Sequence, residues 1–516
     1  MNQGAGKNSI VILDFGSQYT QLIARRVRNS GVFSVILPPS ASIEEIERER
    51  PCGIILSGGP QSVTSSEAPT FEADIFSLHI PILGICYGMQ LISLSLGGRV
   101  EKATHREYGH TIIELKGECA LFDETPKKQK VWMSHGDRVE ELPEGFEVVA
   151  SSSGSPYAAV ADKARRIFGL QFHPEVYHTE FGDKVIGNFL YNICRCPGGW
   201  DSRSFVDMEV EKIRKKVVDE RVLCAVSGGV DSSVMACLVD RAIGKRLVPV
   251  FVDNGLLREG EVEEVKRLLT EHLTAELVFV DASEEFLSRL EGVIDAEKKR
   301  KIIGKCFIDI FEKESKRLGP FKFLAQGTLY PDVIESRSTV GPSATIKSHH
   351  NVGGLPEDLG FELIEPLALL FKDEVREVGR YLGLPEDQIK RHPFPGPGLA
   401  VRIPGEITRE KLSVVRKVDR IFIDALKKSG LYDSVWQAFA VLLPVKSVGV
   451  MGDSRTYQQA VALRAVTSVD GMTADWAKLP YDFLQDVSSE IINRVDGVNR
   501  VVYDISSKPP STIEWE

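Results

Sequence analysis

The sequence predicts an α/β protein: two doubly wound α/β domains with mainly parallel sheets, followed by a small C-terminal α+β domain. Short apolar runs alternate with helix-length segments twice along the chain, and the pattern changes again after residue 391. At 516 residues the chain is too long for one hydrophobic core, because about 150 residues per domain is usual. We therefore predict three domains, at residues 9–198, 199–391 and 392–516.

The composition is typical of a soluble globular protein, with 43% hydrophobic and 26% charged residues. The formal net charge of -10 offers no basic excess for a nucleic acid. No apolar stretch approaches the ~20 residues of a membrane span, and the first eight residues lack the apolar core of a signal peptide. The eight scattered cysteines match neither a disulfide framework nor a zinc motif. We expect a cytoplasmic protein with no nucleic-acid or membrane partner.

The first series of apolar runs predicts a largely parallel sheet within residues 9–196. Each run has the length of a buried strand, and the segments between runs are long enough for the crossovers that parallel strands need. The turn-rich residues 196–199 end the series. The predicted strands cover residues 10–13, 32–37, 53–56 and 81–85.

A second series predicts another doubly wound domain, since helical stretches of suitable length again separate the apolar runs. A long irregular stretch rich in Ser, Gly and His follows at residues 327–354. Loops of that length are usually lids or disordered segments. The predicted strands of this series cover residues 222–226, 247–252, 277–280 and 321–325.

The last part of the chain predicts a small α+β domain. Residues 411–426 have the pattern of an amphipathic helix, and residues 439–450, 460–466 and 498–505 have the pattern of strands. These apolar strands lack a full complement of covering helices. Either an oligomer interface or a contact between domains would cover them.

A Gly-rich turn follows the predicted strand at residues 222–226 and leads into a helix expected to start near Ser232. Several backbone N–H groups at such a turn lack partners and point toward one place, which binds phosphate. A Walker loop would need a Lys after the second Gly, and none is present. The alternative is a Gly/Ser turn with no ligand. The turn consists of Ser227, Gly228, Gly229, Val230, Asp231, Ser232 and Ser233.

A cysteine at the centre of Gly84-Ile85-Cys86-Tyr87-Gly88 predicts a nucleophile elbow. The small flanking residues permit a sharp turn from strand to helix, and the helix dipole favours the Cys86 thiolate. His173 can accept the thiol proton while Glu175, two residues later, orients the ring. The alternative is a buried structural cysteine.

Residues 57–60, Ser-Gly-Gly-Pro, end the predicted strand at 53–56 and supply donors for an oxyanion. We expect the backbone N–H of Gly59 to act with that of Tyr87. Residues 9–196 thereby resemble the class I (triad) glutamine amidotransferases, which hydrolyse the glutamine side-chain amide to glutamate and ammonia. Residues 134–137, Ser-His-Gly-Asp, also match that family. His135 is an alternative base, for which we expect a structural or glutamine-lining role instead.

The phosphate turn resembles the pyrophosphate loop of the ATP pyrophosphatases. Joined to an amidotransferase, and together with four further segments, it makes the chain resemble the glutamine-hydrolysing GMP synthetases from end to end. That resemblance implies that ATP adenylylates the C2 oxygen of XMP, and that ammonia then displaces AMP to give GMP. The four segments are residues 327–336, 346–354, 391–398 and 507–516.

The resemblance also implies substrate-binding residues and a cofactor. Mg²⁺ is expected with ATP, and Asp231 is expected to place it. Lys347 would reach the α-phosphate as part of a lid, unless it is a solvated loop lysine; Lys372 is a second candidate cation. The C-terminal domain would mediate a homodimer. The residues expected to bind XMP are Pro395, Gly396, Lys508 and Glu514.

Two alternatives compete with this interpretation. Another glutamine-dependent ligase of the ATP pyrophosphatase type would share the phosphate loop, but not the amidotransferase domain in this position or the tail at residues 508–516. A non-enzymatic nucleotide sensor would have lost residues of the triad or the loop. Both sets are intact, so the sequence favours the GMP synthetases, acting on ATP, XMP and glutamine.

Overall fold

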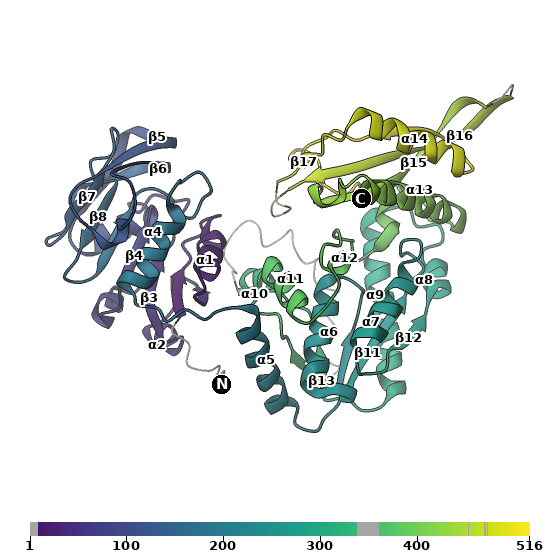
Figure 1. Cartoon of the computed structure of the whole chain (residues 1–516), viewed down its shortest axis with the longest axis horizontal. Helices are drawn as coiled ribbons and strands as arrows, with labels where there is room; N and C mark the ends of the chain where they lie inside the picture. The colour runs from purple at the N-terminus through teal and green to yellow at the C-terminus, as the bar shows by residue number, and fades with distance from the viewer. Residues whose placement is uncertain (1–8, 338–360, 452–453, 469–470, 472) are drawn as a thin grey trace. The chain divides into compact units, whose positions relative to one another are not determined.

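The computed structural model describes residues 9–337, 361–451, 454–468, 471 and 473–516 (Figure 1). The chain divides into two compact units, Met1–Met208 and Glu209–Glu516, which we call the first and second units. Helix α5 (Ser202–Val217) spans this boundary in the sequence. The division into three domains with boundaries at 198 and 391 stays a prediction.

The first unit contains a nine-stranded sheet in the order β2-β1-β3-β4-β9-β8-β7-β5-β6. The strands from β2 to β9 in this order are parallel, and the remaining strands pair antiparallel. All four strands predicted in this region are present. The nine strands are β1 (Ser9–Leu13), β2 (Ser34–Leu37), β3 (Pro51–Leu56), β4 (Ile82–Ile85), β5 (Arg99–Leu115), β6 (Lys128–Glu141), β7 (Glu147–Ser151), β8 (Ala159–Asp162) and β9 (Ile167–Leu170).

The helices of the first unit cover the apolar strands. In α1, Ile23, Ala24 and Val27 are buried on one face, as expected for a helix packed on a sheet. Helix α3 is buried along most of its length, consistent with a position close to β3, β4 and β9. The helices are α1 (Thr20–Asn29), α2 (Ile43–Arg48), α3 (Tyr87–Ser95) and α4 (Gly182–Asn188).

The second unit begins with a five-stranded, wholly parallel sheet in the order β12-β11-β10-β13-β14. The four strands predicted here are present, and β14 is an additional strand. The strands are β10 (Val222–Ala225), β11 (Leu247–Asp253), β12 (Val278–Asp281), β13 (Phe323–Ala325) and β14 (Glu362–Ile364). The helices are α6 (Val230–Ile243), α7 (Glu261–His272), α8 (Ser283–Arg289), α9 (Ala296–Leu318), α10 (Tyr330–Arg337), α11 (Lys372–Tyr381) and α12 (Glu386–Ile389).

Helix α10 corrects part of the prediction of an irregular stretch at residues 327–354. The Asp332 carboxylate accepts a hydrogen bond from the Leu329 N–H at 3.0 Å and so satisfies a donor at the start of the helix. Pro331 suits the first turn because a proline lacks the N–H that would be unpaired there. Residues 338–354 lie outside the described residues.

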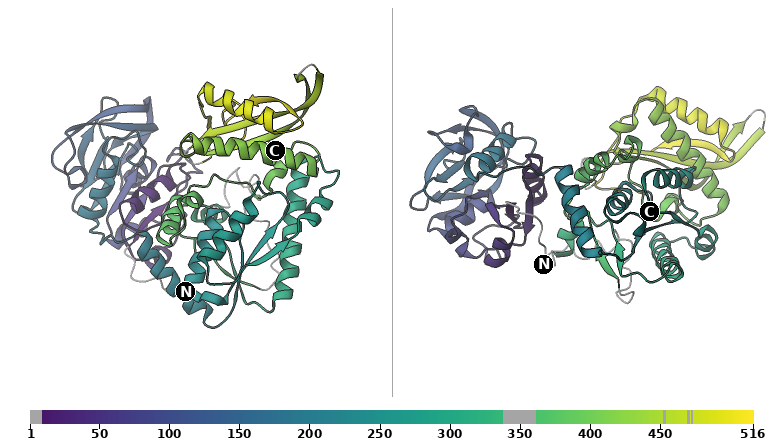
Figure 2. Two further views of the ribbon diagram at one scale, coloured as in Figure 1. Left: turned by 45° about the vertical axis from the view of Figure 1, so that its right-hand side comes forward. Right: turned by 60° about the horizontal axis from the view of Figure 1, so that its bottom comes forward.

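The last sheet has four strands, with β15-β16-β17 antiparallel and β18 parallel to β16. Helices α13 and α14 contact each other and pack on one face, while Ile513 of the tail joins a small core on Phe439, Val441 and Ala462. The β15–β16 hairpin extends beyond both helices (Figure 2). The predicted α+β character is confirmed. The elements are α13 (Arg409–Lys428), β15 (Gln437–Met451), β16 (Ser454–Thr467), β17 (Asp475–Trp476), α14 (Tyr481–Arg494) and β18 (Val498–Tyr503).

Two candidate active sites

Cys86 occupies a sharp turn between β4 and α3. Its φ of 50° and ψ of -102° are unusual for a residue with a side chain, as expected at a nucleophile elbow. Glycine is required at position 88, two residues later, because a Cβ atom there would collide with the Leu56 carbonyl oxygen of β3. The Cys86 N–H donates to the Leu170 carbonyl oxygen at 2.6 Å. The turn is therefore held by the two strands that flank β4.

His173 and Glu175 lie together on the segment that follows β9. The His173 Nδ1 atom is 2.7 Å from the Glu175 Oε1 atom, and the two residues are 3% and 1% exposed. Burial disfavours the charged ring, but the Glu175 carboxylate and a hydrogen bond with Cys86 raise the pKa of His173 well above its usual value. The structure thus brings together the three residues that the sequence grouped, in an arrangement that favours transfer of the thiol proton to the ring.

We expect Glu175→Gln to move the alkaline limb of the glutaminase pH profile to lower pH. Glu175 raises the pKa of His173, so the imidazolium persists to higher pH in the native protein and loses its proton earlier in the variant. The maximal rate should also fall, by roughly a hundred- to ten-thousandfold, because the ring loses its orienting carboxylate. The measurement is kcat/KM for glutamine against pH. The exposed Glu180, on the same segment, is the matched control as Glu180→Gln, and an alkaline limb unmoved in Glu175→Gln would contradict the assignment.

The loop after β3 lies against both His173 and Tyr87. A Cβ atom on Gly58 would be 3.2 Å from His173 Cε1, and one on Gly59 would be 3.0 Å from Tyr87 Cγ. The Gly88 N–H donates to the Ser57 carbonyl oxygen at 3.0 Å. The loop that carries Gly59 and the helix start that carries Tyr87 are therefore neighbours, as an oxyanion hole requires.

A second histidine with a carboxylate partner lies beside the elbow. His135 Nε2 is 3.2 Å from Glu107 Oε2, a residue directly opposite on the neighbouring strand β5, and His135 Nδ1 is 3.0 Å from the Asp137 carbonyl oxygen. The carbonyl oxygen of Ser134, the preceding residue of β6, accepts a hydrogen bond from the Cys86 thiol at 3.6 Å. Burial lowers the pKa of His135, although Glu107 acts in the opposite direction. Sequence spacing missed Glu107 because the pair forms only through strand pairing.

The phosphate turn in the second unit joins β10 to α6, which begins at Val230, two residues before the predicted start. Gly228 has a φ of 80°, in the region that favours glycine. The Ser227 and Ser232 hydroxyls are 3.1 Å apart, and Ser232 Oγ accepts from the Ser227 N–H at 3.2 Å. These bonds close the turn around the start of α6, where unpaired N–H groups and the helix dipole attract an anion.

Asp231, at the centre of this turn, has one carboxylate oxygen paired and one unpaired. Its Oδ2 atom forms an ion pair with Lys372, the first residue of α11. Its Oδ1 atom is buried and has no hydrogen-bond partner in the structure. An orphaned buried carboxylate oxygen beside a phosphate site fits Mg²⁺ bound through ATP, since that ion takes one or two protein carboxylates together with phosphate oxygens. Among the described residues, no group of His, Cys, Asp or Glu is arranged to hold a metal without ATP.

The residues expected at the XMP site are partly brought together. Gln437 Nε2 donates to the Pro393 carbonyl oxygen at 3.2 Å and to Glu514 Oε1 at 2.7 Å, so the tail lies beside the loop that carries Pro395 and Gly396. Glu514 is also bonded to the fully buried Arg402, at 3.1 Å. Sequence reasoning missed both partners of Glu514, which lie 77 and 112 residues away in the chain.

Lys508 lies elsewhere along the tail, with its Nζ atom 2.8 Å from the Gly471 carbonyl oxygen. The buried guanidinium of Arg464 donates to the carbonyl oxygens of Ser506, Thr512 and Ile513 and holds the tail on the sheet. The tail therefore packs on the sheet that contains β15 and β16. The remaining candidate cation, Lys347, lies outside the described residues.

Comparison with known proteins identifies the family to which this chain belongs. Residues 11–193 match the family described as glutamine amidotransferase class-I, and residues 424–515 match the GMP synthase C terminal domain. A protein of Aquifex aeolicus named GMP synthase (glutamine-hydrolyzing) is 58% identical, with 99% of this chain and 100% of the relative covered. The chain belongs to the glutamine-hydrolysing GMP synthase family.

Other members of the GMP synthase family agree with this assignment. The relative from a Nitratiruptor species is 58% identical, and the alignment covers 98% of this chain and 99% of the relative. The relative from Thermosipho africanus is 56% identical, and the alignment covers 99% of this chain and 100% of the relative. The phosphate turn and Lys372 lie between the two matched domain families, in a region that these full-length relatives also cover. Within the described ranges, no helix is both long and apolar enough to cross a membrane.

Proposed function

We propose that this protein makes GMP from XMP, with nitrogen from glutamine and energy from the cleavage of ATP to AMP and pyrophosphate. One observation carries the proposal: near-complete coverage, at 58% identity, of relatives named GMP synthase (glutamine-hydrolyzing). Another glutamine-dependent ligase of the ATP pyrophosphatase type is not favoured, because it would not share the domain matched at residues 424–515.

In the glutaminase half, His173 accepts the proton of the Cys86 thiol, and the thiolate attacks the side-chain carbonyl carbon of glutamine. The His173–Glu175 pair supports this step, since the carboxylate stabilises the imidazolium. Backbone N–H groups of Gly59 and Tyr87 stabilise the oxyanion. The imidazolium then protonates the leaving ammonia, and water hydrolyses the thioester to glutamate.

In the synthetase half, the turn at residues 227–233 holds the β- and γ-phosphates of ATP as a leaving group. The C2 oxygen of XMP attacks the α-phosphorus and pyrophosphate leaves; ammonia then attacks C2, and AMP departs with that oxygen. Asp231 Oδ1 would hold Mg²⁺, which supplies charge neutralisation on pyrophosphate when bound. Lys372, paired with Asp231, contributes a positive charge beside the turn in addition to that of Mg²⁺. Lys347 would act as the lid cation at the α-phosphate.

The XMP site in this proposal comprises Pro395, Gly396, Lys508 and Glu514. Lys508 pairs with the phosphate, and Glu514 accepts hydrogen bonds from ring N–H groups. Glu514 is already held by Arg402 and Gln437, which fixes its carboxylate in place. Pre-organisation of this kind favours binding, because the side chain has little freedom left to lose.

We expect Lys508→Ala to raise KM for XMP about ten- to a hundredfold, since a charge-assisted hydrogen bond contributes about 1.5–3 kcal/mol. KM for ATP should barely change. Steady-state kinetics with XMP varied, at saturating ATP and ammonium, measure both constants. Lys428→Ala, at the exposed end of α13, is the control for loss of a lysine in the same unit. An unchanged KM for XMP would remove Lys508 from the site.

A homodimer and a cytoplasmic location also belong to the proposal. The end of the β15–β16 hairpin exposes Val448, Val450 and Tyr457, which are 45%, 76% and 66% accessible. Val448 and Tyr457 are directly opposite on the two strands, so they form a continuous apolar strip. A second copy of the chain would cover this strip.

The overall proposal is tested by measuring AMP and pyrophosphate release from ATP with the purified protein. Release should require XMP, and GMP should form with either glutamine or ammonium as the nitrogen source. Release that does not depend on XMP, or the absence of GMP, would overturn the proposal.

A further inference from the structure

The carbonyl group of Gly228, within the phosphate turn, is held by two side chains from another part of the second unit. Gln388 Nε2 donates to it at 2.9 Å, and Arg391 donates to it at 3.2 Å. Gln388 also donates to the Ser233 hydroxyl at 3.2 Å, and the residue is 7% exposed. The two donors come from α12 and the residue pair that follows it, about 160 residues from the turn.

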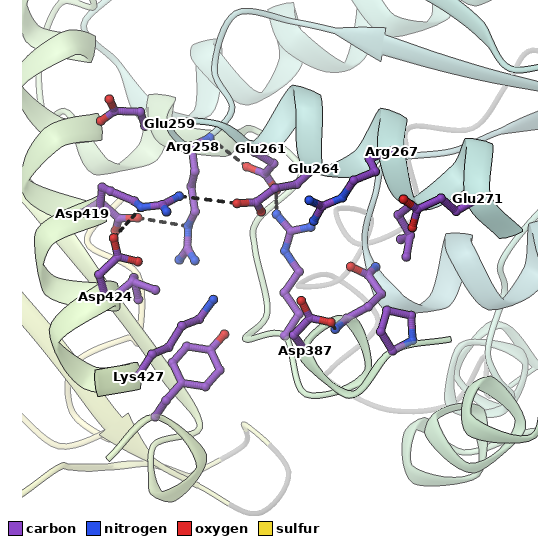
Figure 3. A pocket seen from close by; sticks show the side chains of 17 residues that line it. Arg258, Glu259, Glu261, Glu264, Arg267, Glu271, Asp387, Asp419, Asp424 and Lys427 are labelled. Carbon is purple, nitrogen blue, oxygen red and sulfur yellow. Dashed lines mark hydrogen bonds and ion pairs between the residues drawn. The ribbon is translucent and has the colours of Figure 1, made fainter. Parts of the chain in front are cut away.

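Arg391 is itself fixed by a buried carboxylate. It forms an ion pair with Glu261, the first residue of α7, which is 3% exposed. Glu261 also accepts a hydrogen bond from the Arg258 N–H at 2.8 Å. This network lines a pocket between α7, α12 and α13, in which Glu261 and Arg258 lie on the side opposite Asp387 (Figure 3).

Helix α7 also restricts the turn by direct packing. Gly228 lies so close to Val265 that a Cβ atom at this position would collide with the valine side chain. The contact and the φ of 80° require glycine at this position, and the two hydrogen bonds to its carbonyl oxygen hold the peptide that follows in one orientation.

The orientation of this peptide matters for anion binding. In a planar trans peptide, the carbonyl oxygen of one residue and the N–H of the next point in opposite directions. A Gly228 oxygen held on the side of Gln388 and Arg391 therefore turns the Gly229 N–H to the other side, toward Ser227 Oγ at 3.4 Å. If the peptide were reversed, a carbonyl oxygen would face the phosphates and repel them.

We propose that Gln388 and Arg391 are positioning residues for the ATP phosphate site, which hold the Gly228 carbonyl away from the triphosphate and so aim the Gly229 N–H at it. The inference rests on the proposed role of residues 227–233 in ATP binding. It extends the site to residues that lie outside the phosphate motif and that act through the Gly228 carbonyl group.

The test removes the amide N–H donor of Gln388 while keeping the approximate size of its side chain. Gln388→Glu puts a carboxylate against the carbonyl, and Gln388→Met keeps the length without a donor, should the buried charge prevent folding. We expect KM for ATP, and the Kd of a non-hydrolysable ATP analogue measured by calorimetry, to rise about ten- to a hundredfold. KM for XMP and KM for glutamine should stay close to native values.

Arg391→Lys keeps a cation opposite Glu261 and should weaken ATP binding less than Arg391→Met does. Lys390→Ala, an exposed lysine between the two residues, is the matched control and should behave as the native protein. Native ATP affinity in both Gln388 variants would overturn the inference, as would an equal loss for every substrate together with a lower melting temperature. Calorimetry separates this result from a failure of the proposed function, because it reports ATP binding even without turnover. A native protein that does not bind the analogue would overturn both.

Discussion

Cys86→Ala is expected to abolish glutamine-dependent GMP formation and to leave synthesis from ammonium salts largely intact. Without the thiol there is no nucleophile for the glutamine carbonyl, so the glutamine-dependent rate should fall by at least about a thousandfold. Ammonia supplied directly bypasses that step, and the residues proposed to bind ATP and XMP belong to the other unit. The measurement is GMP formation with glutamine and with ammonium on one preparation.

Cys119→Ala provides the control for this variant. Cys119 is a buried cysteine of the same unit, and burial raises the pKa of its thiol, so it is a poor nucleophile. Its removal should leave both activities close to native. Loss of ammonium-dependent synthesis in Cys86→Ala would argue against two separable sites.

Asp231→Ala should stop the release of AMP and pyrophosphate with either nitrogen source. The variant loses the buried Oδ1 atom proposed to hold Mg²⁺ and leaves Lys372 without its ion-pair partner. We expect a fall on the order of a hundred- to a thousandfold, as for other groups that stabilise charge in a transition state. Coupled assays of pyrophosphate release at saturating XMP measure it.

Two comparisons sharpen the Asp231 experiment. Asp231→Asn keeps the shape of the side chain but not its charge, so a similar loss in that variant would assign the effect to charge. Asp207→Ala, an exposed aspartate on α5, controls for removal of a carboxylate. Glutamine hydrolysis should survive in every case, and normal turnover with ammonium in Asp231→Ala would remove this residue from the ATP site.

The sequence predicted most of the fold because the relevant signals are local. Apolar runs of strand length, separated by crossovers, located β1 to β4 of the first sheet and β10 to β13 of the second, but not β5 to β9 or β14. The change of pattern after residue 391 located the α+β part. The turns at Cys86 and at residues 227–233 were predicted in the same way, since glycine spacing next to a strand restricts the backbone whatever surrounds it. Helix α10 was not predicted, because its start depends on a hydrogen bond from the Leu329 N–H to the Asp332 carboxylate in a polar segment.

The sequence also predicted catalytic groups that lie within one short segment. His173 and Glu175 are two residues apart, and their hydrogen bond joins neighbours in the chain. The order of the signature segments indicated the GMP synthases, to which full-length relatives assign the chain. For this protein, therefore, the sequence by itself determined the fold class, the family and the residues of each local motif.

The tertiary structure alone decided how these motifs are supported. Glu107 reaches His135 by strand pairing, Lys372 reaches Asp231 across 141 residues, and Gln388 reaches Gly228 across 160. Partners of this kind are set by which elements pack together, and no spacing rule along the chain encodes them. The physical reason is that buried polar groups must be paired, and the packed core, rather than the local sequence, determines which partner is within reach.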